Sequence, residues 1–185
     1  MDNGAENYRR FLNGDNGGLV EIVREYKDGL IFYLRGFTDD ILQAEELAED
    51  TFVRLVTKRP RFNQRSKFKT WLYTIGRNIA LDHARRKTRY VEISYGECPE
   101  IANEEASLEQ VYIQEERSIL LHRAMRELKP EYRQILWLVY FEGFTNREAA
   151  AIMKRSVHSV ETLVYRAKRA LRARLDEEDF IYEEL

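Results

Sequence analysis

The chain has 185 residues, enough for one large domain or two small ones, and its formal net charge of -2 gives it no overall attraction to nucleic acid. Its single cysteine excludes an intramolecular disulfide and a zinc site built from paired cysteines. No apolar run is long enough to span a bilayer, and the first ten residues, MDNGAENYRR, lack the apolar segment of a signal peptide. We therefore expect a soluble protein of the cytoplasm, without direct membrane insertion.

Charge is distributed very unevenly along the chain. Residues 54–90 contain 12 Lys/Arg and one acid, Asp82. Residues 91–116 contain 8 Glu and no Lys or Arg, and the last ten residues carry 6 acids. The basic segment is therefore the part of the first half that suits a polyanionic partner.

The sequence predicts an almost entirely helical protein, because the alternating apolar patterns typical of strands are absent. In the first half we expect helices over about 18–36, 38–58 and 67–87, with Thr38 capping the second. These three helices can bury one shared core, so residues 1–90 are predicted to form a domain.

The helix predicted over 67–87 has two different sides. The apolar side, expected to face the core, carries Phe68, Leu72, Ile75 and Ile79. The opposite side, expected to point away from the core, carries Thr70, Tyr73, Thr74, Arg77 and Arg85.

Basic and aromatic residues are interleaved between Arg61 and Tyr73. Cations neutralise a nucleic-acid backbone while aromatic faces accept unstacked bases, so this composition favours single-stranded or melting DNA. The polar loop 62–66 suits the edge of a base pulled out of the duplex. The alternative is that Phe68 and Trp71 both belong to the core and that the lysines are only solvated. The candidate DNA-binding residues are Phe62, Asn63, Arg65, Lys67, Lys69, Trp71 and Tyr73.

The acidic residues 91–115 lack periodicity and contain Gly96 and Pro99, which predicts a flexible linker. A second compact domain is expected over 116–175, followed by an acidic tail, 176–185. The helices expected in the second domain cover about 116–128, 130–142, 145–153 and 157–175.

The last two helices have the pattern of a helix-turn-helix. Thr145 and Glu148 form the sequence of a capping box, and Ser156 can cap the following helix. An ordinary helical hairpin with a solvated basic face would share this periodicity, but the small residues 149–151 permit the close helix crossing that a DNA-reading unit needs. The candidate contacts to bases and phosphates are Ser156, His158, Ser159, Thr162, Tyr165, Arg166 and Arg169.

Taken together, the two halves resemble the extracytoplasmic-function (ECF) group of bacterial RNA polymerase sigma factors. The resemblance covers about 17–87 and 120–174, and its motifs are AEELAEDTF at 44–52, FKTWLYTIGRNIALD at 68–82, and FEGFTNREAAAIM at 141–153 with the helix 160–170. Jointly, in that order and spacing, these motifs are highly specific. The resemblance implies an all-α fold of two small helical domains joined by a flexible acidic linker, the second containing the helix-turn-helix.

The resemblance also implies partners: core RNA polymerase, promoter DNA and an anti-sigma factor. The loop 62–68 and the helix after it, with Arg77 and Asn78 near the DNA, would recognise and open the promoter −10 element. Residues 158–169 would read the −35 element while their domain docks on the β flap, and the linker would occupy polymerase channels. The residues implied to bind the β′ clamp are Gln43, Glu46, Glu49, Asp50 and Phe52.

Two features depart from the pattern of this group. The recognition helix often has Lys-Ser-Arg where this chain has Glu161-Thr162-Leu163, so two expected cations are missing and −35 binding is expected to be weaker or different. The tail 176–185 mixes acids with apolar residues. One hypothesis is that it folds back on a basic DNA-binding face; the alternative is a frayed, solvated tail.

Two other functional classes fit the sequence less well. A stand-alone operator-binding regulator would usually dimerise, and it would leave the basic-aromatic stretch unexplained. An enzyme acting on nucleic acid is disfavoured because His83, His122 and His158 are scattered, without paired carboxylates, a metal-ligand cluster or a phosphate-binding loop. We therefore expect no catalytic residue, no metal and no cofactor.

Overall fold

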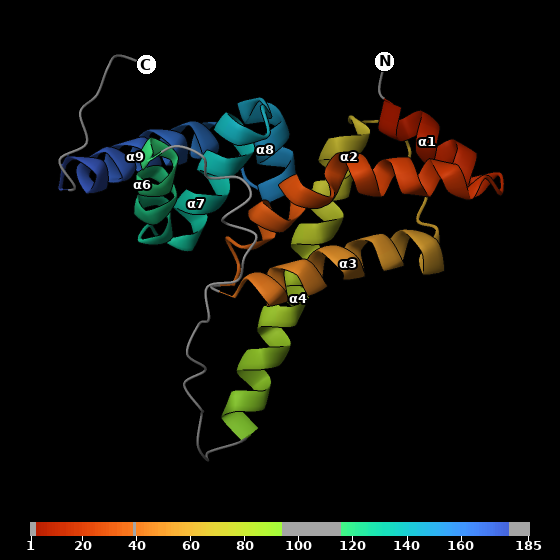
Figure 1. Ribbon diagram of the computed structural model, residues 1–185, viewed down its shortest axis with the longest axis horizontal. Helices are drawn as coiled ribbons and strands as arrows, with labels where there is room; N and C mark the ends of the chain where they lie inside the picture. Colours follow the sequence, from red (N-terminus) through yellow and green to blue (C-terminus); the bar gives the residue numbers. More distant parts are fainter. Residues whose placement is uncertain (1–2, 39, 94–115, 178–185) are drawn as a thin grey trace.

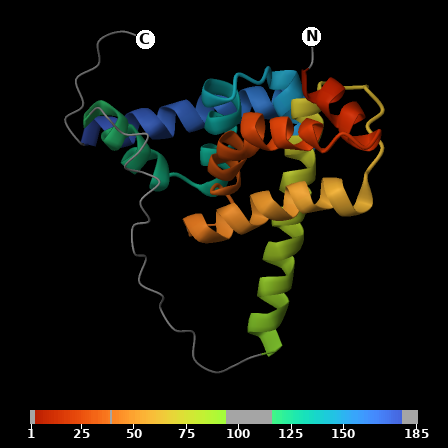
Figure 2. The same ribbon diagram turned by 45° about the vertical axis from the view of Figure 1, so that its right-hand side comes forward.

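The computed structural model describes residues 3–38, 40–93 and 116–177, and no strand occurs among them. Two helical groups lie side by side: the first group is α1–α4 and the second group is α6–α9 (Figures 1 and 2). The all-α prediction, with a helix-turn-helix in the second group, is confirmed. Most of the predicted linker and of the acidic tail lies outside the described residues. The bounds are α1 Asn3–Leu12, α2 Asn16–Leu34, α3 Ile41–Lys58, α4 Phe68–Ile93, α6 Glu116–Arg126, α7 Pro130–Leu136, the π-helical turn η1 Trp137–Phe141, α8 Asn146–Met153 and α9 Val157–Glu177.

Helix α1 was not predicted from the sequence. It packs on α2 and buries Tyr8 and Phe11, which lie three residues apart on one face of an otherwise polar helix. The hydroxyl of Tyr8 donates a hydrogen bond to the carbonyl oxygen of Pro60 at 2.7 Å, so α1 is also attached to the segment after α3. Burial raises the pKa of Tyr8 to about 12, and the opposing effect of Arg59 is smaller.

Helices α2 and α3 form where they were predicted, but the cap of α3 is different. Asp40, rather than Thr38, is the N-cap, because its side chain accepts a hydrogen bond from the Leu42 amide at 3.0 Å. The Thr38 hydroxyl instead donates to Gln43 Oε1 at 2.9 Å. Thr38 therefore fixes a side chain in the first turn of α3.

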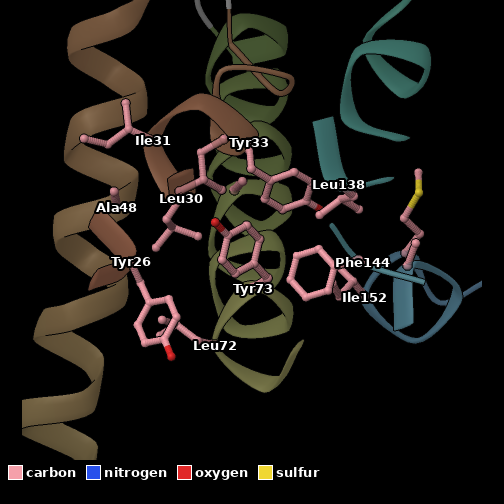
Figure 3. Packing of buried hydrophobic residues seen from close by; sticks show 14 of the residues in the cluster. Tyr26, Leu30, Ile31, Tyr33, Ala48, Leu72, Tyr73, Leu138, Phe144 and Ile152 are labelled. Carbon is pink, nitrogen blue, oxygen red and sulfur yellow. The ribbon is translucent and has the colours of Figure 1, made fainter. Parts of the chain in front are cut away.

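Helix α4 corrects the expectation that one of its sides would point away from the core. Thr70 is 2% exposed and Tyr73 is 0% exposed, although both lie on the side of α4 that was predicted to be free. The Tyr73 ring packs against both the Tyr33 ring, at 5.4 Å between centroids, and the Phe144 ring, at 5.1 Å (Figure 3). The core consequently runs without a break from the first group into the second.

The second group contains the predicted helix-turn-helix with both of its predicted caps. Thr145 Oγ1 accepts from the Glu148 amide at 3.2 Å while Glu148 Oε2 accepts from the Thr145 amide at 2.9 Å, which completes the capping box. Ser156 Oγ accepts from the Ser159 amide at 3.2 Å at the start of α9. Between the two helices the chain turns through Lys154, whose backbone is left-handed with φ 53°.

The helix predicted over 130–142 is not one regular α-helix. Helix α7 ends at Leu136 and continues as η1, in which the Trp137 and Phe141 rings stack with centroids 4.4 Å apart. π-Helical turns are rare, and periodicity alone does not distinguish one from an α-helix.

Candidate nucleic-acid interface

Helix α9 presents the predicted DNA-reading side chains to the surface. Val160 and Ala167 are buried against the rest of the second group, whereas Tyr165 is 63% exposed. Thr162 is half-buried, and its hydroxyl donates to the His158 carbonyl oxygen at 3.0 Å. The other predicted members of this surface are half-buried at Ser159 and exposed at Ser156, His158, Arg166 and Arg169.

The two unusual residues of the recognition helix have different environments. Glu161 is exposed and lies on the surface of α9. Leu163 is 5% exposed and belongs to the core. Only Glu161 is therefore placed to alter the charge that α9 offers to a phosphate backbone.

The loop before α4 exposes the polar side chains that were predicted to read a base. Asn63, Arg65 and Lys67 are exposed, and Asn63 Oδ1 accepts from the Arg65 amide at 3.2 Å. The backbone of Gln64 is left-handed, with φ 57°, which turns the loop sharply between them. The loop therefore exposes amide and guanidinium groups to the solvent.

The aromatic residues of the same stretch pack on one another. The Phe62 and Trp71 rings are 5.2 Å apart, and both contact Phe68, which is fully buried. Phe62 and Trp71 are themselves half-buried. Trp71 is therefore packed against its aromatic neighbours while part of its side chain is accessible.

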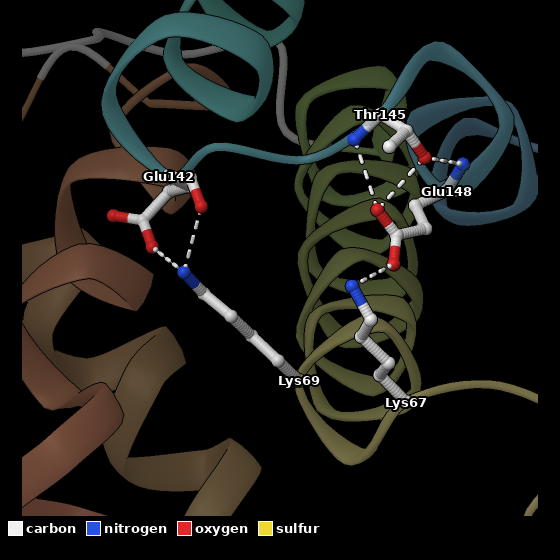
Figure 4. A network of polar contacts seen from close by, with 5 residues as sticks. All are labelled: Lys67, Lys69, Glu142, Thr145 and Glu148. Atoms are coloured by element: carbon white, nitrogen blue, oxygen red, sulfur yellow. Dashed lines mark hydrogen bonds and ion pairs between the residues drawn. The ribbon is translucent and has the colours of Figure 1, made fainter. Parts of the chain in front are cut away.

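Two lysines of the predicted melting surface bind carboxylates of the second group (Figure 4). Lys67 Nζ lies 3.0 Å from Glu148 Oε1. Lys69 Nζ lies 2.8 Å from Glu142 Oε2 and donates to the Glu142 carbonyl oxygen at 2.9 Å. The acid at Glu148 thereby serves two purposes, since its other oxygen completes the α8 capping box.

Tyr73, another predicted DNA contact, is not accessible in this arrangement. Burial raises its pKa well above the ordinary value for tyrosine, and the neighbouring Glu142 carboxylate raises it further. The side chain is therefore a neutral phenol at physiological pH. Contact between Tyr73 and DNA requires the second group to move away.

A cleft of about 590 Å³ lies where α4 meets the turn between α8 and α9. Arg77 and Asn78 line it from α4, and Lys154 and Arg155 line it from the turn. Arg155 is paired with Glu131 at 2.7 Å, whereas the buried Nε of Arg77 has no hydrogen-bond partner among the described residues. The cleft places the predicted −10 contacts Arg77 and Asn78 beside two cations of the second group, Lys154 and Arg155, that were not predicted as contacts.

Helix α3 carries a mixed acidic and apolar surface. Glu46, Glu49 and Asp50 are exposed, as predicted for contacts to another protein. Phe52 is 7% exposed and belongs to the core, so its side chain is not offered to a partner. Gln43 is half-buried and lies 3.5 Å from the His83 ring nitrogen. Exposed apolar side chains that were not predicted lie along α3 at Leu42, Val53 and Val56.

Sequence reasoning missed the residues with which the second group covers the first. Gln134 donates to the Gly36 carbonyl oxygen at 2.8 Å, and Trp137 donates to the Gly29 carbonyl oxygen at 3.2 Å. Glu142 and Phe144 were known only as members of the 141–153 motif. The sequence hints at this contact through two glycines, Gly29 and Gly36, which lie within or beside a helix. A Cβ at either position would meet a side chain of the second group.

Within the described residues, no group of His, Cys, Asp and Glu side chains is arranged to hold a metal ion. None of the described helices is long and apolar enough to cross a membrane.

Comparison with known proteins assigns both groups to one family. Residues 22–90 match Sigma-70 region 2 and residues 118–171 match Sigma-70, region 4. The chain is also 30% identical over 157 residues to the ECF RNA polymerase sigma factor SigM of Bacillus subtilis, covering 84% of this chain and 93% of SigM. The chain belongs to the ECF group of RNA polymerase sigma factors.

A second relative of this sigma factor is the ECF sigma factor BldN of Streptomyces coelicolor, 28% identical over 167 residues. The match covers 90% of this chain, which spans only 63% of BldN. The fold is similar to that of the sigma factor RpoE from Bartonella quintana, with a TM-score of 0.68 at 24% identity, covering 84% of this chain and 95% of that one. As a sigma factor, the protein directs promoter-specific transcription initiation, and a stand-alone operator-binding regulator is not favoured.

Proposed function

We propose that this sigma factor recognises two separate promoter elements, one with each helical group, while bound to core RNA polymerase. The observation that carries this proposal is that one chain exposes two different surfaces suited to DNA. The loop 61–67 is polar, basic and flanked by aromatic rings, and the α9 face is basic and supported by a capped helix-turn-helix. A regulator that binds duplex DNA on its own has no use for the first surface.

The first group is proposed to bind and open the −10 element. Asn63 and Arg65 in the exposed loop would contact a base that has left the duplex. The other proposed contributors are Phe62, Trp71 and Tyr73 by stacking, Lys67, Lys69 and Arg77 by pairing with phosphates, and Asn78 by a polar contact.

The second group is proposed to read the −35 element through α9. Tyr165, Arg166 and Arg169 project from the exposed side of the helix, where a major groove would accept them. Ser156, His158, Ser159 and Thr162 lie at its N-terminal end, where a recognition helix commonly meets base edges and phosphates.

Helix α3 is proposed as the surface that docks on the β′ clamp of the polymerase, with the second group docking on the β flap. Glu46, Glu49 and Asp50 offer charge to a basic partner surface, and the exposed Val53 supplies apolar contact beside them. Gln43 contributes at the edge of this surface. Phe52 contributes only by holding α3 in place, since its side chain is buried.

We also propose that the protein acts in the cytoplasm, has no enzymatic activity, and is controlled by an anti-sigma factor. The support for such a partner is that the similar RpoE structure was determined in complex with the anti-sigma factor NepR.

Run-off transcription tests the proposal. Purified protein is added to bacterial core polymerase on a pool of genomic promoter fragments. New transcripts should start at a fixed distance downstream of two shared elements. Arg65→Ala should reduce promoter opening more than promoter binding, and Arg24→Ala, which removes an exposed arginine from α2, should change neither. An absence of transcripts together with no co-elution of protein and core would instead support a stand-alone regulator.

A further inference from the structure

Helix α1 lies outside the segment that matches Sigma-70 region 2, which begins at residue 22. The segment that joins α3 to α4, and that contains the loop 61–67, runs past this helix (Figures 1 and 2). Side chains of α1 contact the chain both before and after that loop. The helix is therefore placed to influence how the loop is held.

Tyr8 is the residue of α1 that joins both ends of the loop. Its hydroxyl donates to the carbonyl oxygen of Pro60, directly before the loop, at 2.7 Å. Its ring packs on Phe68 and Trp71 in the first turn of α4, at 5.6 and 5.3 Å between centroids. Tyr8 is 1% exposed, and burial raises its pKa to about 12, so the hydroxyl stays a hydrogen-bond donor at neutral pH.

Two neighbouring contacts add to this attachment. Arg59, the C-cap of α3, has its guanidinium 5.5 Å from the centre of the Phe11 ring on α1. Gly4 brings the backbone of α1 close to α4, because a Cβ at this position would collide with the Phe68 ring. The end of α3 and the start of α4 are thus both packed on α1.

The loop depends on such contacts because it has no helical hydrogen bonds of its own. Residues 61–67 form no helix, and Asn63 and Arg65 are exposed. Gln64 has a left-handed backbone, φ 57°, which is uncommon for a residue other than glycine and persists where the surrounding structure holds it. A loop that is already held in its binding conformation loses less conformational entropy when it binds.

We infer that Tyr8 is a positioning residue for the capture of the −10 base, because it fixes both ends of the loop 61–67. The exposed Asn63 and Arg65 are then in place to meet the base that leaves the duplex. This inference rests on the proposed function of the loop. It extends the promoter-opening unit to α1, beyond the residues 22–90 that match Sigma-70 region 2. Tyr8 acts through the loop and does not itself touch DNA.

The decisive variant is Tyr8→Phe, which keeps the ring and removes the hydrogen bond to Pro60. The matched control is Tyr33→Phe. Tyr33 is also a buried tyrosine of the first group, and its hydroxyl has no hydrogen-bond partner among the described residues. Denaturant unfolding of both variants and the parent protein gives the global stability against which the local effects are compared.

The first readout is the rate at which trypsin cleaves the free protein after Arg65, with the cleaved bond identified by mass spectrometry. Local opening exposes a loop to a protease without unfolding the rest of the protein. Loss of the hydrogen bond should raise this rate by about two- to tenfold in Tyr8→Phe. The rate in Tyr33→Phe should match that of the parent protein. An unchanged rate in Tyr8→Phe would overturn the inference.

The second readout is the affinity of the protein, bound to core polymerase, for a single-stranded oligonucleotide with the −10 sequence found by run-off mapping. A second oligonucleotide lacks the base at the most strongly preferred position. Tyr8→Phe should bind the intact oligonucleotide about two- to tenfold more weakly than the parent protein and the abasic one equally well. A role confined to the stability of the fold would lower both affinities alike, and that result would overturn the inference.

The double variant Asn63→Ala with Arg65→Ala removes both reading side chains and separates two kinds of failure. If it abolishes the preference for the intact oligonucleotide while Tyr8→Phe retains that preference in full, the loop reads the base and only the role of Tyr8 is overturned. If the double variant retains the preference, the loop does not read the base, and the proposed function of the loop fails together with the inference that rests on it.

Discussion

Lys69 Nζ lies 2.8 Å from the carboxylate of Glu142 and 2.9 Å from the carbonyl oxygen of the same residue. One side chain of the first group is thereby held by both the side chain and the backbone of one residue in the second. Replacing the carboxylate by an amide removes the ion pair but leaves the backbone acceptor. The contact is expected to loosen in steps as its parts are removed.

Removing the cations of α9 should weaken −35 recognition. Arg166→Ala and Arg169→Ala each remove an exposed guanidinium from the proposed reading face. Loss of a residue that contacts a base should cost about 1–3 kcal/mol of binding free energy and relax the sequence preference. Loss of a residue that contacts a phosphate should weaken binding to all sequences alike and reduce the salt slope by about 1. Transcription from promoters with systematically varied −35 elements, at several salt concentrations, distinguishes the two. An equal loss with Arg24→Ala would show that α9 has no special role.

Glu161 and Leu163 should respond oppositely to an added cation. Glu161→Lys replaces an exposed acid and should strengthen binding to −35 DNA, with a steeper salt dependence. Leu163→Arg buries a charge at a position that is 5% exposed and should reduce the free energy of unfolding by about 3 kcal/mol or more. Denaturant unfolding and DNA binding measured on both proteins test this. Similar behaviour of the two variants would contradict the burial difference.

Val53 should be required for binding to core polymerase. Val53→Asp places a charge in the proposed apolar contact of α3 and should weaken the complex by about tenfold or more. The control is Val20→Asp on α2, because Val20 is 54% exposed and Val53 is 53% exposed. Titration of labelled protein with core polymerase gives both affinities. Equal affinities for the two variants would remove α3 from the docking surface.

The contribution of Glu148 to stability should depend on pH. Burial raises its pKa, but the hydrogen bonds from Thr145 and the contact with Lys67 together outweigh burial, so the pKa is lowered from its ordinary value of 4.5. A carboxyl group with a lowered pKa stabilises the folded protein above the ordinary value, and the effect is lost as the pH falls through the lowered one.

The corresponding measurement compares the parent protein with Glu148→Gln. Their difference in unfolding free energy should be about 0.5–1 kcal/mol at neutral pH and should shrink as the pH falls below about 4.5. A difference that stays constant for Glu148→Gln would show that its charge does not act in the folded state.

Features set by neighbouring residues were predictable from the sequence. The capping box at Thr145 and Glu148 and the cap at Ser156 depend on three-residue spacing, and both form as expected. The exposed face of α9 likewise follows from helical periodicity. These parts of the candidate site needed no knowledge of the rest of the molecule.

Features set by distant residues were not predictable. Tyr73 is polar enough to be placed on a surface by periodicity, but Tyr33 and Phe144, 40 and 71 residues away in the sequence, both pack against its ring and it is buried. The pair of Lys69 and Glu142 joins residues 73 positions apart, and no local pattern encodes such a contact. Helix α1 was missed because only three large apolar side chains, Tyr8, Phe11 and Leu12, distinguish it from a polar segment.

The contact between Gln134 and Gly36, which lie 98 residues apart, joins residues that the ribosome makes at different times, and so does the contact between Lys69 and Glu142. Every residue of the first group is made before its covering residues. Glu142 is added 73 residues after Lys69, or roughly 4–15 s later at about 5–20 residues per second. A nascent chain, or one ended by a stop codon between 94 and 133, therefore has an uncovered first group.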